Sequence, residues 1–279
     1  MVNFQLDEMQ EMLKELAHQF AVEEIRPHAE HWDTESIYPK EAIQSAHEMG
    51  LLNLHIGEEY GGPGLGSMEE VLVNEELAWG DPGFATAAYA TSLACAPIIT
   101  GATEEQKQMW LGKVAQEGAL ASYAVTEPGA GSDVAACKTT AVRDGDEYVI
   151  NGSKMWITGA GYADFFFVLA KTDVDAGYKG MSGFIVESDA EGFSLGKKEV
   201  NMGQRCSDTR SIQFDDVRIP ANQLIGGSES GGWMNAMKAF DMSRPNIAAH
   251  ATGLARAAYE HALQYSGERS TFGLSLIHI

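Results

Sequence analysis

Basic residues are scarce in this sequence, which holds 19 lysines and arginines against 40 aspartates and glutamates. The formal net charge is therefore −21 over 279 residues. A surface of this sign repels nucleic-acid phosphates and anionic lipid headgroups, so we expect neither nucleic acid nor a membrane as a partner. An anionic small molecule would need favourable groups gathered at its own site.

Cysteine is also scarce, and the histidines form no ligand set. Cys95, Cys137 and Cys206 lie far apart without a C-x-x-C pair, so we expect neither a disulfide framework nor a zinc site. We interpret Cys137 and Cys206 as packing residues. Four histidines lack a third ligand at metal-binding spacing, so we expect no metal and place them on the surface or on helix faces. They are His28, His31, His47 and His55.

Basic leader sequences, membrane-spanning runs and complete nucleotide-binding glycine motifs are lacking too. The first residues are acidic and amphipathic, and we identify no apolar run of membrane-spanning length. No G-x-x-x-x-G-K-[ST] is present. Gly129 and Gly131 form a G-x-G, but Val134 stands where a dinucleotide fingerprint needs its third glycine. The sequence therefore shows neither of these two common nucleotide-binding loops.

What the sequence does contain is a turn-rich stretch after a short apolar run at residues 123–125. It reads Thr126-Glu-Pro-Gly-Ala-Gly-Ser132-Asp133. Pro128 and two glycines predict a turn in which backbone N–H groups come together. With the hydroxyls of Thr126 and Ser132, such amides form a concave set of donors suited to anionic oxygens.

A second stretch follows about twenty residues later. Asn151-Gly152 between two β-prone runs predicts a hairpin. The second strand ends in Trp156-Ile-Thr158, and side chains two residues apart on a strand point to one face. There the indole could cover a flat ring while the hydroxyl donates to a ring atom. The plainer alternative is a β-hairpin protein with a buried tryptophan and an ordinary Pro-Gly loop.

Hydrophobic periodicity divides the chain into a helical part (1–119), a β part (120–228) and a second helical part (229–279). Short alternating runs in the middle part are typical of a β-barrel or sandwich. They are residues 148–150, 154–158, 165–170, 182–186 and 211–214. In the last part apolar residues return at helical spacing, at Met234, Met237, Phe240, Ile247, Leu254 and Ala258.

Boundary signals place several helix ends. Ser67 with Glu70, and Thr103 with Gln106, predict capping boxes at two helix starts, and Asp81-Pro82 predicts a third. The apolar composition of residues 84–99 predicts a helix buried on most sides. Pro27 predicts that the first helix ends or kinks there, and Arg244-Pro245 predicts a kink or a restart in the last helix.

The run from Tyr123 to Asp133, together with Lys154-Met-Trp156-Ile-Thr158, resembles the flavin-binding pair of the acyl-CoA dehydrogenases. The segment Asn201-Met-Gly-Gln-Arg-Cys-Ser-Asp-Thr-Arg210 is similar to the medium-chain members. The resemblance extends from about Leu6 to Gly273. It implies an α+β fold with an N-terminal helical domain, a middle β-barrel or sandwich domain and a C-terminal helical bundle, here incomplete.

The same resemblance implies FAD as the cofactor and an acyl-CoA thioester as the substrate. The implied flavin-binding residues are Tyr123, Val125, Thr126, Gly131, Ser132, Trp156, Ile157 and Thr158. Arg269 and Thr271 would reach the flavin of a neighbouring subunit, which implies a homo-oligomer, commonly a tetramer in the family. Ser132, Asp241, Ser243 and Arg244 would bind the substrate, with Arg244 at a coenzyme A phosphate.

The implied reaction is α,β-dehydrogenation of acyl-CoA, the first step of fatty acid β-oxidation, with electrons passed to an electron-transfer flavoprotein. The family's proton acceptor is a glutamate, and at one of its two known positions this chain has Ser243. Since no glutamate follows Glu268, we find no candidate catalytic base and expect a truncated reading frame with exposed apolar helix faces.

Two alternatives remain open. The chain could be an inactive flavin-site fragment or binding module, or an acyl-CoA oxidase that uses oxygen. By resemblance we expect a cytoplasmic protein if the source is bacterial, and the mitochondrial matrix if it is eukaryotic, although we see no transit peptide.

Overall fold

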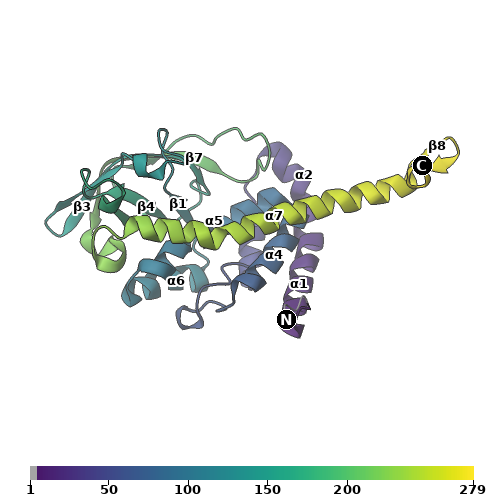
Figure 1. Ribbon diagram of the computed structural model, residues 1–279, viewed down its shortest axis with the longest axis horizontal. Helices are drawn as coiled ribbons and strands as arrows, with labels where there is room; N and C mark the ends of the chain where they lie inside the picture. The colour runs from purple at the N-terminus through teal and green to yellow at the C-terminus, as the bar shows by residue number, and fades with distance from the viewer. Residues whose placement is uncertain (1–4) are drawn as a thin grey trace.

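The computed structural model describes residues 5–279, in which a helical N-terminal part and a curled sheet are joined by one long helix (Figure 1). The N-terminal helices are α1 (Glu8–Phe20), the π-helical turn η1 (Ala21–Ile25), α2 (Arg26–Glu35), α3 (Lys40–Glu48), α4 (Ser67–Gly80), α5 (Pro82–Gly101) and α6 (Glu104–Glu117). The sheet strands are β1 (Ala121–Ala124), β2 (Thr140–Asp144), β3 (Glu147–Thr158), β4 (Phe165–Lys171), β5 (Met181–Glu187), β6 (Phe193–Leu195) and β7 (Thr209–Pro220). The long helix α7 (Gly232–Glu268) is followed by the short strands β8 (Ser270–Thr271) and β9 (Leu274–Ser275). The predicted α+β fold is confirmed.

Side-chain caps fix where α5 and α6 begin, as the sequence predicts. The Asp81 carboxylate accepts a hydrogen bond of 2.8 Å from the amide of Phe84 at the start of α5. At the start of α6 the Gln106 amide donates to the Thr103 hydroxyl, and the Thr103 amide donates to the Gln106 side chain. Both predicted helix starts are confirmed.

The cap of α4 differs from the prediction by one residue. The amide of Gly66 donates to Oε2 of Glu69 at 3.0 Å, and Ser67 is the first helical residue. Glu70 is buried and its carboxylate has interior partners instead. The Ser67–Glu70 capping box is therefore wrong, because packing takes the second of two adjacent glutamates into the core and leaves the first to cap the helix.

Pro27 does not end the first helix. The π-helical turn Ala21–Ile25 ends two residues before it, and the amide of Arg26 donates to the carbonyl oxygen of Ala21 five residues back. The helix then continues through α2 to Glu35. Since proline lacks an N–H and crowds the preceding turn, one widened turn accommodates it without breaking the helix.

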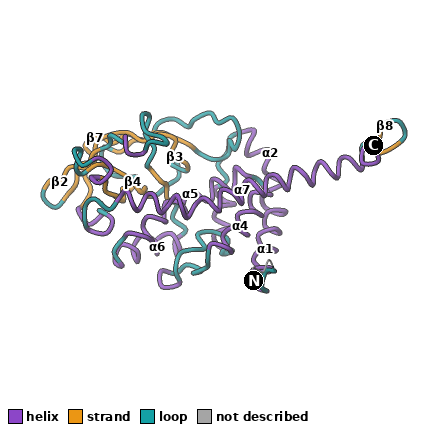
Figure 2. The backbone as a smooth tube through the Cα atoms, in the orientation of Figure 1, coloured by secondary structure: helices purple, strands orange, loops and turns teal. Residues whose placement is uncertain are grey.

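The strands form one mixed sheet in the order β1-β4-β2-β3-β7-β6, with β5 paired to β4. β1 and β4 run parallel, whereas the long strands β3 and β7 run antiparallel. Figure 2 shows the strands gathered at one end of the molecule. The sheet surrounds an apolar cluster that includes Tyr148, Phe184 and Phe214, so burying this cluster holds the curled sheet together.

The Asn151-Gly152 hairpin is a wrong prediction. β3 runs uninterrupted through both residues and pairs with β7, with a register shift between Ile150 and Gly152. Gly152 has φ +144°, and a Cβ there would lie 2.7 Å from Cα of Thr139. The pair therefore makes a bulge where the backbone of a neighbouring segment comes close, and glycine permits both features.

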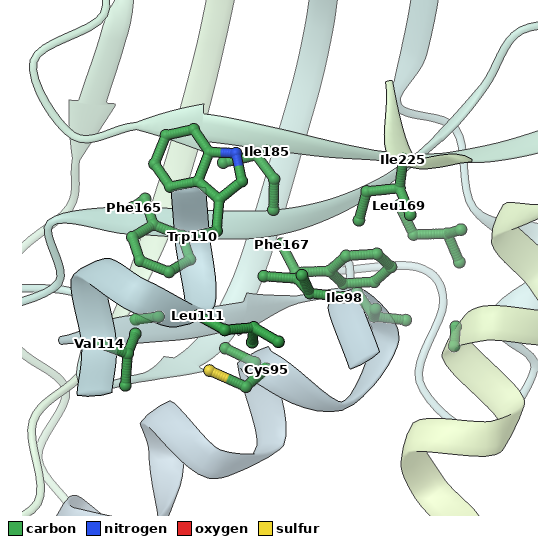
Figure 3. Packing of buried hydrophobic residues seen from close by; sticks show 14 of the residues in the cluster. Cys95, Ile98, Trp110, Leu111, Val114, Phe165, Phe167, Leu169, Ile185 and Ile225 are labelled. Carbon is green, nitrogen blue, oxygen red and sulfur yellow. The ribbon is translucent and has the colours of Figure 1, made fainter. Parts of the chain in front are cut away.

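The main core lies between the helices and one face of the sheet (Figure 3). Trp110 of α6 packs against Phe165 of β4 with ring centroids 4.9 Å apart, and Cys95 and Ile98 of α5 complete this contact region. Among the described helices α5 is long and apolar enough to cross a bilayer, contrary to our expectation of no such run, but 78% of that window is buried in the protein. The predicted burial of this helix is confirmed, and the core accounts for its apolar surface. All three cysteines are buried and free.

α7 is a single helix of 37 residues that passes through Pro245, so no restart occurs there. Its buried seam consists of small and polar residues at spacings of three and four, namely Ala236, Ala239, Ser243, Asn246, His250 and Gly253. The apolar residues expected from the sequence are divided, since Met237 and Phe240 pack against the main core whereas Met234, Ile247 and Leu254 are exposed. Figure 1 shows α7 extending beyond the other elements to β8, and Tyr259 and Leu263 on that extension are exposed, as expected.

A buried polar network joins α7 to α4 and α5. The Asn246 side chain donates to the Glu70 carboxylate at 2.8 Å, and the Asn74 side chain donates to Asn246 at 2.9 Å. Asn74 in turn bonds Nε2 of His250. The other carboxylate oxygen of Glu70 lies 2.7 Å from Nδ1 of His55, which is therefore a largely buried hydrogen-bond partner rather than a surface histidine. Small seam residues thus let two helices approach, and polar groups fix their register.

We expect Gly253→Ala to destabilise the protein. An added Cβ would collide with the carbonyl oxygen of Glu75 and lie 2.9 Å from the amide nitrogen of Trp79 on α4. The strain of overpacking, about 2 kcal/mol, outweighs the gain of about 1 kcal/mol in helix propensity. Urea unfolding measures the difference. Gly267→Ala on the same helix, where a Cβ meets nothing within 4 Å, is the control and should show no loss.

We also expect a pH effect from His250, whose burial lowers its pKa from 6.5 to about 4. The unfolded chain takes up a proton near pH 6.5 while the folded chain stays neutral, so stability is complete above that pH and falls toward pH 4. The loss is at most about 3 kcal/mol. Between pH 7 and 4 the His250→Gln variant should lose less unfolding free energy than the wild type. The control His261→Gln, at an exposed residue, should lose as much unfolding free energy as the wild type. If His250→Gln leaves the change of unfolding free energy with pH unaltered, this explanation is wrong.

Candidate active site

The two stretches singled out in the sequence meet where β1 and β3 end. The Ser122 hydroxyl donates to the carbonyl oxygen of Thr158 at 2.7 Å, and the amide of Met155 donates to the carbonyl oxygen of Thr126 at 2.9 Å. These bonds place Thr126 beside the segment that carries Trp156 and Thr158. Residues about thirty positions apart are thus brought to one place.

Trp156 lies in an irregular part of β3. The register with β7 shifts between Lys154 and Ile157, and Trp156 has φ +63°, an uncommon conformation for a bulky side chain. Trp156 is 56% exposed, whereas Ile157 is buried in the sheet core. The tryptophan is not the buried one of the plainer alternative. Strained backbone of this kind is frequent at functional sites, which makes Trp156 a candidate site residue.

Unused hydrogen-bond donors occur in both of the segments that meet here. Within residues 5–279 no protein acceptor lies opposite the hydroxyls of Thr126, Ser132 or Thr158, or opposite the amides of Gly131 and Ser132. Gly131 and Ser132 are exposed, and a Cβ on Gly131 would meet nothing within 4 Å. Free hydroxyls beside an exposed flat ring suit the heteroatoms of a flavin, and free amides suit its pyrophosphate. The residues present therefore fit FAD.

The predicted turn between these donors is present. The amide of Glu127 donates to the carbonyl oxygen of Ala130, and the amide of Ala130 donates back to that of Glu127. Pro128 and Gly129 form the exposed tip between them. This tight turn begins the loop that carries Gly131 and Ser132.

A buried ion pair lies at the base of this loop. The ammonium group of Lys154 is 2.9 Å from the carboxylate of Glu127, with side-chain exposures of 0% and 6%. Burial acts to raise the pKa of Glu127, but the charge of Lys154 and hydrogen bonds from Cys137, Thr139 and the Lys138 amide lower it to about 2. The carboxylate is thus ionised at all physiological pH values. We did not anticipate this pair; a lysine two residues before Trp156 in an otherwise β-prone run is the sequence signal that could have indicated it.

Tyr123 and Val125 lie on the interior side of the site. The Tyr123 hydroxyl donates to the carbonyl oxygen of Ala236 on α7 at 3.0 Å, and its ring stacks on Phe167 with centroids 5.2 Å apart. Burial raises the pKa of Tyr123. Val125 is part of the main core. Both residues thus connect the candidate site to the main core. Their contact with a flavin ring stays a prediction.

The predicted substrate residues on α7 do not all face the same way. Asp241 and Arg244 form an exposed ion pair of 2.6 Å, whereas Ser243 is buried in the seam against α4 and α5. The Ser243 hydroxyl donates to the carbonyl oxygen of Phe240. Because it is an uncharged donor held within its own helix, Ser243 is unsuited to accept a proton.

Arg269 and Thr271 lie far from the rest of the candidate site. They follow α7, which is about 55 Å long at 1.5 Å per residue, and Figure 1 shows β8 at the opposite end of this helix from the sheet. This chain's own site does not include them. Their predicted role at a neighbouring subunit's flavin stays a prediction.

The segment 201–210 joins the sheet to the N-terminal helices. The Arg205 amide donates to the carboxylate of Asp33 at 2.8 Å, and its guanidinium forms an ion pair with the same residue. The Asp208 carboxylate accepts a bond of 2.8 Å from the Gly161 amide and pairs with Arg210. The segment thereby supports the turn that follows β3. Among the residues that the structure describes, no group of three or more His, Cys, Asp or Glu side chains could hold a metal ion.

Comparison with protein families gives three consecutive matches. The acyl-CoA dehydrogenase N-terminal domain matches residues 7–118, the middle domain residues 122–217 and the C-terminal domain residues 230–278. A probable medium-chain specific acyl-CoA dehydrogenase 2 of Caenorhabditis briggsae, mitochondrial by its name, is 45% identical over 279 residues. These cover 99% of this chain and 68% of that protein.

Solved structures agree. One from a study of the electron transferring flavoprotein of Acidaminococcus fermentans has a TM-score of 0.96 at 39% identity, covering 100% of this chain and 73% of that one. Butyryl-CoA dehydrogenase of Megasphaera elsdenii has a TM-score of 0.95 at 37% identity, covering 99% and 73%. An acyl-CoA dehydrogenase of Bacillus anthracis complexed with FAD has a TM-score of 0.90 at 32% identity, covering 100% and 47%. Together with the domain matches and the free donors around Trp156, these similarities show that the chain belongs to the acyl-CoA dehydrogenase family, whose cofactor is FAD.

Proposed function

We propose that this acyl-CoA dehydrogenase acts on medium-chain acyl-CoA thioesters in fatty acid β-oxidation and passes the electrons to an electron-transfer flavoprotein. The observation that carries the proposal is the set of unpaired hydroxyls on Thr126 and Thr158 beside the exposed indole of Trp156. The medium-chain name of the worm relative supports the chain length. The Acidaminococcus study concerns an electron transferring flavoprotein, which supports that partner.

The residues have distinct proposed roles. When bound, the flavin accepts the β hydride of the substrate, and this chemistry belongs to the cofactor. Trp156 covers one face of its ring, and the hydroxyls of Thr126 and Thr158 donate to ring heteroatoms. Gly131 and Ser132 offer donors to the pyrophosphate, or Ser132 to the substrate arm. Arg244, exposed with guanidinium N–H groups beyond its bond to Asp241, binds a coenzyme A phosphate.

The proton acceptor is the part that these residues do not supply. Removing a proton from the α carbon requires a base within hydrogen-bond reach, and Ser243 holds its proton toward the Phe240 carbonyl. We propose that a carboxylate at another position performs this step. An inactive flavin-binding module is the second candidate function, and the buried, uncharged state of Ser243 is the observation that favours it.

Assembly and location are proposals of the same kind. The position of Arg269 and Thr271 at the far end of α7 supports a contact with the flavin of a second subunit, in a homotetramer. We propose a cytoplasmic location for a bacterial source and the mitochondrial matrix for a eukaryotic one.

We expect the flavin-loaded protein to lose its oxidised-flavin absorbance when octanoyl-CoA is added without oxygen. Adding an electron-transfer flavoprotein should restore the absorbance, whereas air should yield little hydrogen peroxide. Rapid peroxide formation would favour the oxidase alternative. If the flavin binds but keeps its absorbance with acyl chains from four to sixteen carbons, the inactive module is correct.

We expect Thr158→Val and Thr126→Val each to weaken flavin binding by about tenfold, since a hydrogen bond is worth about 1.4 kcal/mol at most when both partners are neutral. Their unfolding free energies should stay near that of the wild type, because neither hydroxyl has a protein partner among the described residues. The matched control is Thr139→Val, whose hydroxyl donates to the buried Glu127 at 2.6 Å. That variant should instead lose stability. Calorimetric titration with FAD and urea unfolding separate the two effects.

A further inference from the structure

The Glu127 carboxylate joins the two ends of the loop that follows β1. The loop leaves the sheet at Glu127 and returns at Lys138 and Thr139, and all of the closing bonds end on one carboxylate. Oε2 accepts from the Lys138 amide at 2.7 Å, and Oε1 accepts from the Thr139 amide at 3.0 Å and the Thr139 hydroxyl at 2.6 Å. Cys137 adds a bond from its thiol at 2.7 Å. The thiol also reaches the carbonyl oxygen of Leu169 at 3.8 Å, but without the carboxylate the other three donors would be left unpaired.

The other partner of the ion pair, Lys154, also has a hydrogen-bond acceptor for each of its donors. Its ammonium group can donate three hydrogen bonds, and it donates to the carboxylate of Glu127, to the carbonyl oxygen of Val125 at 3.1 Å and to Sγ of Cys137 at 3.5 Å. No part of its side chain is exposed. A buried ion pair adds little net stability compared with apolar side chains of the same size, so its presence at this place calls for another role.

The ion pair connects both halves of the flavin site. One partner begins the loop that carries Gly131 and Ser132, and the other lies on β3 two residues before Trp156. Lys154 also bonds the carbonyl of Val125, directly before Thr126. We propose that Glu127 and Lys154 are positioning residues for the flavin, and that their balanced charges help to set its reduction potential. This inference rests on the proposed flavin site.

The two opposite charges predict that removing one or the other shifts the flavin reduction potential in opposite directions. Glu127→Gln leaves a buried ammonium group without its counter-charge next to the site, and a positive charge favours the reduced, more electron-rich flavin. Lys154→Met leaves a buried carboxylate without its counter-charge, still accepting from Cys137, Lys138 and Thr139, and a negative charge disfavours reduction. The double variant removes both charges.

The experiment measures flavin affinity and reduction potential in the flavin-loaded chain for the wild type, both single variants and the double variant. We expect Glu127→Gln to raise the potential, Lys154→Met to lower it, and the double variant to return it toward the wild-type value. Each single variant should also bind FAD at least about tenfold more weakly, the effect that supporting residues have on the groups they orient. Glu147→Gln is the control. Glu147 lies on β3, as Lys154 does, and its substitution removes an exposed ion pair with Arg218. This variant should change neither the flavin affinity nor the reduction potential.

The outcomes are distinguishable. Potentials that are equal in all four proteins, or that shift in the same direction in both single variants, would overturn the inference and leave the proposed function standing. A wild-type chain that takes up no flavin would overturn the proposed function and this inference with it. Should a single variant fail to fold, the direction of the shift in reduction potential is obtained by comparing the other single variant with the double variant. In the double variant an amide and a thioether side chain keep the volume of the original pair.

Discussion

A buried carboxylate and a buried ammonium group lie where three segments of this protein converge. Glu127 lies three residues after β1, Lys154 lies on β3, and Cys137 to Thr139 lead into β2. Each segment contributes backbone or side-chain groups that would be unpaired without the other two. A polar cluster of this kind is stable only when every member is satisfied. The geometry of the exposed loop and of Trp156 therefore depends on groups that are almost fully buried.

The long helix α7 has two faces with opposite chemistry. Toward α4 and α5 it presents small and polar residues, which permit the close approach at Gly253 and the bonds of Asn246. On the other side it presents Ile247, Leu254 and Tyr259 to the outside. Small residues thus mark its close helix contact, and large apolar residues mark the surface that no other described element covers.

The acidic character of the chain shapes how it can hold anionic ligands. Most described arginines are already paired, as Arg205 is with Asp33 and Arg256 with Glu76. The candidate site relies on hydroxyls and backbone amides, which carry no net charge and whose orientation is fixed by the strands and the turn. Such donors can bind phosphate oxygens without a cluster of cations. Neutral donors at the site thereby offset part of the electrostatic repulsion that a net charge of −21 exerts on phosphate-bearing ligands.

Local patterns in the sequence determined the helix and strand content, the caps at Asp81 and Thr103, and the turn at Pro128, because each depends on residues only a few positions apart. The motifs around Thr126 and Trp156 also sufficed to indicate a flavin site. Only the tertiary structure decided that Asn151-Gly152 is a bulge, that Glu69 rather than Glu70 caps α4, and which face of α7 is buried. These features depend on backbone and side chains that come close from distant parts of the chain. The ion pair of Glu127 and Lys154 is of the same kind, since no spacing rule relates residues that meet only when the segment after β1 folds against β3.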